Sequence, residues 1–77
     1  MSEVTFEIKE KIGVINENEQ SGWKKMLCIV SWNGGQPKVD IREWSPDFRK
    51  MSRGITLTEQ EAQQVVDLLR DYKHRKR

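Results

Sequence analysis

The chain has 77 residues, enough for one small domain and too few for two independent hydrophobic cores. Hydrophobic residues make up 35% and charged residues 34% of the sequence, which excludes both a disordered chain and a membrane-spanning one. The only cysteine is Cys28, so we expect no internal disulfide and a reducing, cytoplasmic location. The first four residues contain no basic region or apolar stretch, so we expect no secretory signal.

The formal net charge of +2 conceals an uneven layout along the chain. Residues 20–55 carry seven basic side chains against three acidic ones, a net charge of +4, and they contain all three tryptophans. Residues 1–19 and 56–72 each carry a net charge of −3, and residues 73–77 add +4. This layout favours a polyanionic partner for the middle segment. The basic tail is either a further site of phosphate attraction or a solvated terminus.

Patterns of apolar residues and turn residues predict four strands, over residues 4–15, 23–32, 37–44 and 53–57. Gly13 indicates either a bulge or a close backbone approach in the first strand, and residues 16–22 form a polar loop after it. Asn33-Gly34-Gly35 supplies residues that tolerate positive φ, so it predicts a tight turn between the second and third strands. Residues 45–52 are expected to form an irregular connection to the short fourth strand.

The last predicted element is a helix that begins with a capping box. Thr58 is placed as the N-cap and Glu61 lies three residues later, while Leu57 and Ala62 are spaced for a hydrophobic staple. Apolar residues at helical spacing then continue to Tyr72 and cover an arc of about 160°, wider than the ~100° that one packing surface needs. The helix is therefore either deeply seated, or it packs on its own sheet and also on a second copy of the chain. The expected dimer interface consists of Val65, Val66, Leu68, Leu69 and Tyr72.

The hairpin of the second and third strands separates two sets of side chains. Alternate residues of each strand point to the same side, and we call each such set a parity. One parity is apolar, and we expect it to be the core face; it contains Leu27, Ile29, Val39 and Ile41. The other parity mixes apolar, aromatic and charged residues, and we expect it to be the outer face. Its members are Lys24, Met26, Cys28, Val30, Trp32, Lys38, Asp40, Arg42 and Trp44. The alternation of the first strand places Lys9 and Lys11 toward the same outer face.

Aromatic side chains interleaved with basic ones on an open sheet fit single-stranded nucleic acid. Unpaired bases stack on aromatic planes for roughly 1–3 kcal/mol each, while cations follow the phosphates. Trp32 and Trp44 are therefore the expected stacking positions, whereas Trp23 lies on the core parity and is expected to be structural. The pattern is also compatible with tryptophans that only cover the sheet, with basic side-chain stems beside them.

Two segments of the chain, residues 39–44 (VDIREW) and residues 52–58 (SRGITLT), resemble the positive cofactor four family of transcriptional coactivators. Residues 39–44 (VDIREW) are similar to that family's aspartate-isoleucine-arginine-glutamate-aromatic segment, and residues 52–58 (SRGITLT) to its basic-glycine-isoleucine-serine-leucine segment before a helix. The resemblance covers about residues 6–72. It implies an α+β fold, with a curved four-stranded antiparallel sheet followed by one C-terminal helix. It also implies a homodimer that binds single-stranded DNA with little sequence preference.

The resemblance also implies roles for individual residues. Arg42 matches a third-strand arginine that contacts DNA, and Arg53 matches the basic residue before the glycine-isoleucine pair. Trp32 lies near the family's stacking phenylalanine, and Trp44 replaces a tyrosine. The turn is one residue longer than in the family, so Lys38 is at best a substitute for its turn lysines. Together, the expected phosphate contacts are Arg42, Arg53, Lys38, Lys24, Lys9 and Lys11.

We identify no catalytic constellation, metal site or cofactor motif, so we expect a binding protein rather than an enzyme. Asp40 and Glu43 lie three residues apart on a strand and face opposite sides, so Asp40 is better suited to offset neighbouring cations, including Arg42 or Lys38. His74 stands alone in the basic tail, and Cys28 has no histidine partner nearby in sequence.

The expected organisation is a single domain over residues 1–77, with a folded core at 4–72 and a basic tail at 73–77. Such a protein would act in transcription, replication or repair, with transcription or replication proteins as further partners and no membrane. In a bacterium it would be nucleoid-associated. Two alternatives remain: an RNA-binding module that uses the same face, and a protein-interaction adaptor with exposed aromatic residues.

Overall fold

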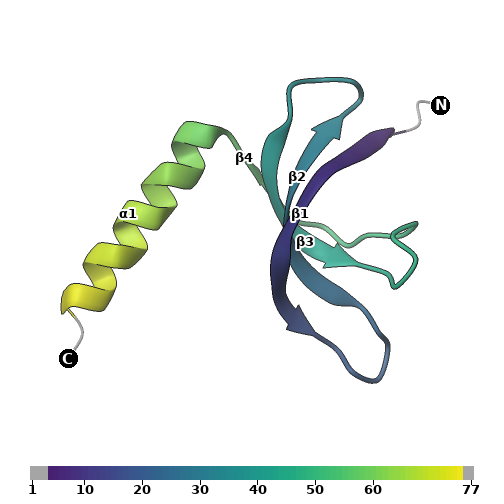
Figure 1. The fold of residues 1–77 in the computed structure, drawn as a ribbon, viewed down its shortest axis with the longest axis horizontal. Helices are drawn as coiled ribbons and strands as arrows, with labels where there is room; N and C mark the ends of the chain where they lie inside the picture. The colour runs from purple at the N-terminus through teal and green to yellow at the C-terminus, as the bar shows by residue number, and fades with distance from the viewer. Residues whose placement is uncertain (1–3, 76–77) are drawn as a thin grey trace.

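A computed structural model describes residues 4–75 as a four-stranded antiparallel sheet followed by one helix (Figure 1). The elements are β1 (Phe6–Glu17), β2 (Lys24–Trp32), β3 (Lys38–Trp44), β4 (Ile55–Leu57) and α1 (Glu59–Arg75). The strands lie in the order β1-β2-β3-β4, so strands that are neighbours in the sheet are also consecutive in sequence. The predicted α+β class and the order of the elements are confirmed.

The turn between β2 and β3 has the backbone geometry that its sequence predicts. Asn33 and Gly34 both have positive φ, at 52° and 73°, and the Gly35 N–H donates to the Trp32 carbonyl at 2.8 Å. Two successive residues with positive φ match the twist of the flanking strands. The register across this hairpin pairs Met26 with Arg42 and Cys28 with Asp40, so the side chains group into the two predicted parities.

β1 contains three register shifts, between Ile8 and Glu10, between Lys11 and Gly13, and between Val14 and Asn16. Each extra residue bends the strand and turns the side chains that follow to the other face. The bulge at Gly13 was predicted, but the other two were not. As a result, Lys11 lies opposite Cys28, whereas Lys9 forms an ion pair with Glu7 at 3.1 Å on the other face. The prediction that both lysines share one face is therefore wrong.

The hydrophobic core lies on the parity that we expected to face outward. Its buried members are Met26, Cys28, Val30 and Trp44, and the half-buried Phe6, Ile8, Trp32, Phe48 and Met51 pack against them. The curved β1 and the connection after β3 supply the side chains that cover this face. The parity predicted as the core, with Leu27, Ile29, Val39 and Ile41, is only half-buried in the single chain. The two parities were grouped correctly, but their roles were reversed.

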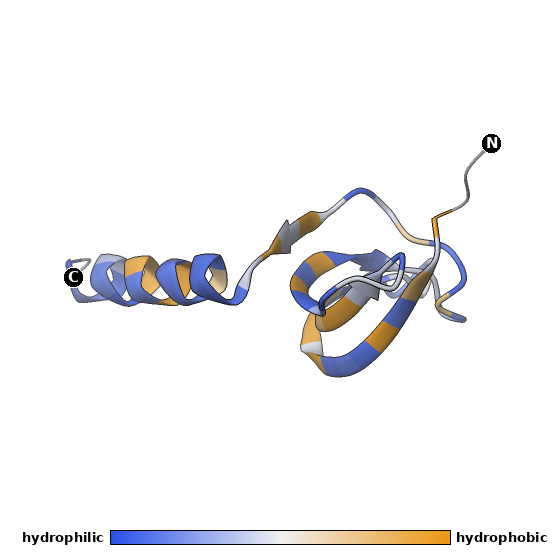
Figure 2. Ribbon diagram, turned by 90° about the horizontal axis from the view of Figure 1, so that it is seen from above, coloured by the Kyte–Doolittle hydropathy of each residue, from blue (hydrophilic) through white to orange (hydrophobic). Residues whose placement is uncertain are grey.

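The capping box at the start of α1 is confirmed. The Thr58 N–H donates to Glu61 Oε1 at 2.8 Å, and the Glu61 N–H donates to Thr58 Oγ1 at 3.1 Å. α1 then extends away from the sheet and has no buried residue, so the single chain does not contain a deeply seated helix (Figures 1 and 2). The helix also continues to Arg75, so residues 73–75, expected in a tail, are helical. Residues 76 and 77 lie outside the described residues.

An apolar cleft of about 220 Å³ lies between the beginning of α1 and the half-buried face of the sheet. It is lined by Ile12, Leu27, Val39, Ile41, Leu57, Ala62, Val65 and Val66. The two residues of the predicted staple, Leu57 and Ala62, are both among them. Further along the helix, Leu68 and Leu69 are 57% and 55% exposed. The single chain thus leaves a continuous set of apolar side chains without cover.

Gly54 passes so close to β3 that a side chain has no room there. A Cβ at this position would overlap the Cβ of Arg42 and the carbonyl oxygen of Ile41, and neither group can move without disturbing the strand. We expect Gly54→Ala to lower the free energy of unfolding by roughly 1–3 kcal/mol, as overpacking does. Urea denaturation measures this change.

Gly13→Ala is the matched control, because an added Cβ there meets nothing within 4 Å. It should change the free energy of unfolding much less than Gly54→Ala does. Equal losses in the two variants would contradict the packing constraint at Gly54.

Candidate nucleic-acid interface

Four aromatic side chains form a row along the buried face of the sheet. The ring centroids of Trp32 and Phe6 are 5.8 Å apart, those of Phe6 and Trp44 5.2 Å, and those of Trp44 and Phe48 5.9 Å. All three pairs are tilted, at separations that favour contact between aromatic rings. The rings come from β2, β1, the end of β3 and the β3–β4 connection. We call Trp32, Phe6, Trp44 and Phe48 the aromatic row.

Exposure differs between the middle of the aromatic row and its ends. Trp44 has 0% of its surface exposed, because Phe6 and Phe48 lie against it. Its indole offers no surface to a base, so the expected stacking role of Trp44 is not supported. Trp32 and Phe48, at the two ends, are only half-buried. The row is thus a core element in its middle and a surface element at its ends.

A cation lies over the ring at each end of the aromatic row. The guanidinium carbon of Arg42 is 4.5 Å from the ring centroid of Trp32, and Lys11 Nζ is 3.9 Å from that of Phe48. Both distances are within the ~6 Å over which cation–π attraction acts. The predicted interleaving of aromatic and basic groups therefore occurs, although Phe48 was not one of the expected residues.

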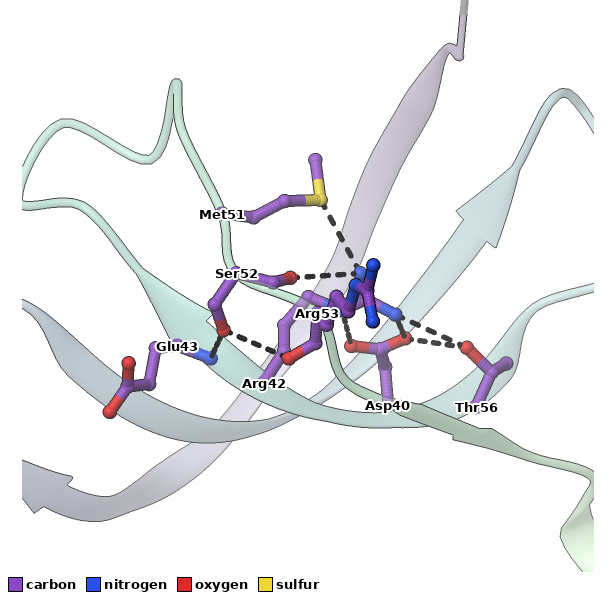
Figure 3. Close-up of polar contacts among 7 residues, drawn as sticks. All are labelled: Asp40, Arg42, Glu43, Met51, Ser52, Arg53 and Thr56. Carbon is purple, nitrogen blue, oxygen red and sulfur yellow. Dashed lines mark hydrogen bonds and ion pairs between the residues drawn. The ribbon is translucent and has the colours of Figure 1, made fainter.

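Arg42 is held by a fully buried carboxylate (Figure 3). Its Nε donates to Asp40 Oδ1 at 2.5 Å, and its Nη2 donates to Asp40 Oδ2 at 2.9 Å. The Thr56 hydroxyl donates to the same Oδ2 at 2.9 Å. A buried carboxylate requires such partners, because desolvation of an unpaired charge costs several kcal/mol. The expected pairing of Asp40 with a neighbouring cation is therefore present, and it fixes the guanidinium in a two-pronged geometry.

The remaining N–H groups of Arg42 also point at protein acceptors. Nη1 donates to the Ser52 carbonyl oxygen at 3.3 Å and lies 3.6 Å from the Met51 sulfur, as Figure 3 shows. The Arg42 side chain is 13% exposed. Its expected role as a direct phosphate ligand is therefore not supported by its present contacts. Its position over Trp32 instead makes it part of the stacked surface at that end of the aromatic row.

The other predicted cations lie at several places on the sheet. Lys38 is exposed and pairs with Val30, on the parity of the aromatic row, and Lys24 pairs with Trp44 on the same parity. Arg53 is exposed beside a cleft of about 360 Å³, which Lys25 also lines. Trp23, expected to be structural, is half-buried just before β2. The structure brings together Trp32 and Arg42 and leaves Lys9 on the opposite face.

The sequence reasoning missed the β3–β4 connection as part of the surface. Phe48 lies there, followed by Arg49 and Lys50, which are both exposed. The available signal was the run Asp-Phe-Arg-Lys at residues 47–50, an aromatic residue next to two basic ones. The pattern of residues 45–52 predicts only an irregular connection, because it has neither the alternation of a strand nor the spacing of a helix that would place Phe48 on a face.

The described residues do not offer an evident catalytic group. Burial raises the pKa of the Cys28 thiol, with the nearby Asp40 carboxylate adding to the shift and Lys11 opposing it. The thiol is therefore protonated at neutral pH and a poor nucleophile. Among residues 4–75, no group of three or more His, Cys, Asp or Glu side chains could hold a metal ion. No helix in this part of the chain is long and apolar enough to cross a membrane.

Comparisons with known proteins agree with this architecture. The sequence pattern of the family described as Transcriptional Coactivator p15 (PC4) matches residues 19–68, which include β2, β3, β4 and the first half of α1. A protein of Treponema pallidum (strain Nichols), described as uncharacterized, is 42% identical over 64 residues. This match covers 83% of the present chain and 74% of the relative. The chain therefore belongs to the transcriptional coactivator p15 (PC4) family.

Proposed function

We propose that this protein binds single-stranded DNA with little sequence preference, through the aromatic row and the cations around it. Its family is one of nucleic-acid-binding, non-enzymatic proteins with a coactivator-like role. The observation that carries the proposal is the half-exposed Trp32, with the Arg42 guanidinium stacked on its ring. Lys38 lies on the same parity, near this end of the row. A stacking surface beside phosphate-binding cations is the basic requirement for holding a single strand.

Bases can stack on either component of the Trp32–Arg42 pair. Indole rings and guanidinium planes both accept an unpaired base, without regard to its identity. In this proposal Arg42 acts by orienting the stacked surface, because Asp40 offsets its charge and occupies its donors. The phosphates are then contacted by four other expected cations: Lys38 and Lys24 on the parity of the aromatic row, Lys11 at its Phe48 end, and Arg53 beside the cleft that Lys25 also lines. Lys9 is left out, because it lies on the opposite face.

A single strand fits this surface better than a duplex does. Reading a duplex requires a helix or a two-stranded ribbon that enters a groove. α1 is the one helix among residues 4–75, and it carries Glu59 and Glu61 in its first turn, which would face the phosphates unfavourably. RNA remains the second candidate ligand, because stacking and phosphate contacts alone do not distinguish the two sugars.

We further propose that the protein is a homodimer in which α1 and the apolar cleft are covered by a second copy. The apolar side chains on α1 are 40–57% exposed; they are Val65, Val66, Leu68, Leu69 and Tyr72. Only four apolar residues are buried in the described chain, which is a small core for a stable domain. Pairing of two helices and two clefts would enlarge that core. As a soluble dimer on single-stranded DNA, the protein would serve transcription, replication or repair in the cytoplasm, within the nucleoid of a bacterium.

Titration with a fluorescently labelled oligo-dT tests the binding proposal. We expect binding at low salt and a weaker affinity at higher salt. Each phosphate contacted should add about 0.7 to the slope of the logarithm of the binding constant against the logarithm of the salt concentration. Trp32→Ala should weaken binding by roughly 5- to 150-fold, the loss of one stacked base, as followed by fluorescence anisotropy. Trp23→Ala is the control with an equal change in side-chain size, and it should bind like the unmodified protein.

Circular dichroism must show that both variants remain folded. Absence of oligo-dT binding at low salt, or equal affinity for duplex DNA, would overturn the proposal. Competition by a matched RNA oligomer that is stronger than competition by DNA would favour the RNA alternative. Salt-insensitive capture of one protein, without nucleic acid, would instead favour an adaptor.

Sedimentation equilibrium tests the dimer. We expect a mass twice that of the 9.1 kDa chain, and Leu68→Glu should shift the equilibrium to the monomer, because it places a charge in the apolar interface. Gln63→Glu adds the same charge on another face of α1 and should leave the dimer intact. A monomeric mass for the unmodified protein at micromolar concentration would contradict the dimer.

A further inference from the structure

Phe48 occupies the end of the aromatic row opposite to Trp32. Its ring is 5.9 Å from that of Trp44, and Lys11 Nζ lies 3.9 Å from its centroid. Trp32 has the same kind of surroundings, with Phe6 as its neighbour in the row and the Arg42 guanidinium over its ring. Both end residues are half-buried. The two ends therefore have matching environments, although they come from different elements.

The backbone at Phe48 indicates that its ring is needed at this place. Phe48 has a φ of 61°, which is unfavourable for a bulky side chain and would suit glycine or asparagine better. The loop holds this conformation, because the Phe48 N–H donates to the Ser45 carbonyl at 2.9 Å. Asp47 Oδ1 accepts from the Ser45 hydroxyl at 2.7 Å and from the Arg49 N–H at 3.0 Å. The ring is thus fixed at the surface by a loop that stores strain.

Three basic residues belong to this end of the aromatic row, by contact or by sequence. Arg49 and Lys50 follow Phe48 directly, and both are exposed. Neither forms an ion pair within residues 4–75, and the exposed Lys11 is likewise without a carboxylate partner there. A half-buried aromatic ring, a cation over it and two exposed cations next in sequence provide both groups that a nucleotide requires, a stacking surface and phosphate ligands.

We propose that Phe48 is a second base-stacking position for single-stranded DNA. In this proposal the Lys11 ammonium moves away from the Phe48 ring, and a base stacks in its place. A long, exposed lysine side chain can swing aside at little cost, whereas Arg42 at the other end is fixed by Asp40. The displaced ammonium then contacts the phosphate next to the stacked base, together with Arg49 and Lys50. This inference rests on the proposed binding of single-stranded DNA.

Stacking is distinguished from charge by comparing oligo-dT with an abasic oligomer of the same length. Phe48→Leu keeps apolar cover over Trp44 and removes the aromatic face, so we expect about tenfold weaker binding of oligo-dT and an unchanged affinity for the abasic strand. Phe48→Tyr keeps a ring and should therefore retain more of the oligo-dT affinity than Phe48→Leu does. Lys11→Gln should instead lower the slope of the logarithm of the binding constant against the logarithm of the salt concentration by about 0.7 for both strands.

The outcomes separate this inference from the proposed function. Binding of oligo-dT by Phe48→Leu at the unmodified level, or an equal loss on both strands, overturns the stacking role of Phe48 alone. Failure of the unmodified protein to bind oligo-dT overturns the proposed function as well.

A measurement on the unmodified protein covers the case in which Phe48→Leu does not fold. The chain contains two phenylalanines, so ring-labelled phenylalanine gives two sets of NMR signals. Oligo-dT should shift the Phe48 ring signals, and the abasic strand should shift them much less. Phe48 signals that respond equally to both strands, or to neither, would overturn the inference.

Discussion

The buried ion pair of Asp40 and Arg42 ties together the parts of this protein that form the candidate interface. Asp40 has no exposed surface, and a carboxylate in that position is stable only while a cation and further donors satisfy it. Arg42 supplies two hydrogen bonds and Thr56 of β4 a third, and the Ser52 carbonyl accepts from Arg42. Hydrogen bonds around the Asp40 carboxylate and its Arg42 partner thus link β3, β4 and the connection between them. The guanidinium that this charge fixes lies over Trp32.

We assign a different binding role to each face of the sheet. One face carries the aromatic row, which is buried at Trp44 and half-exposed at Trp32 and Phe48, and we assign the nucleic acid to these ends. The other face carries the apolar cleft and leads to α1, and we assign the second copy of the chain to it. A dimer arranged in this way would leave both ends of the aromatic row free, so association and binding would not compete.

The sequence predicts the order of the elements, the capping box at Thr58, and the division of the hairpin into two parities, because these depend on local patterns. It does not predict which parity is the core, since both contain enough apolar side chains. That choice depends on long-range features: the three bulges in β1, and the return of Phe48 and Met51 over Trp44. The same long-range contacts bury Trp44, so its ring has no exposed surface on which a base could stack. The face on which Trp32 and Lys38 lie and the pairing of Asp40 with a neighbouring cation follow from the sequence pattern, whereas the position of the Arg42 guanidinium over the Trp32 ring does not.

The central claim is that Asp40 orients Arg42 over Trp32, and the oligo-dT affinity of Asp40→Asn tests it most directly. The substitution removes a negative charge close to a polyanion, so charge alone predicts tighter binding. If the ion pair positions the stacked surface, Asp40→Asn should bind oligo-dT more weakly than the unmodified protein, at a temperature where circular dichroism shows both to be folded. Equal or tighter binding by the folded variant would contradict this role and would identify Arg42 as a phosphate ligand that Asp40 holds back.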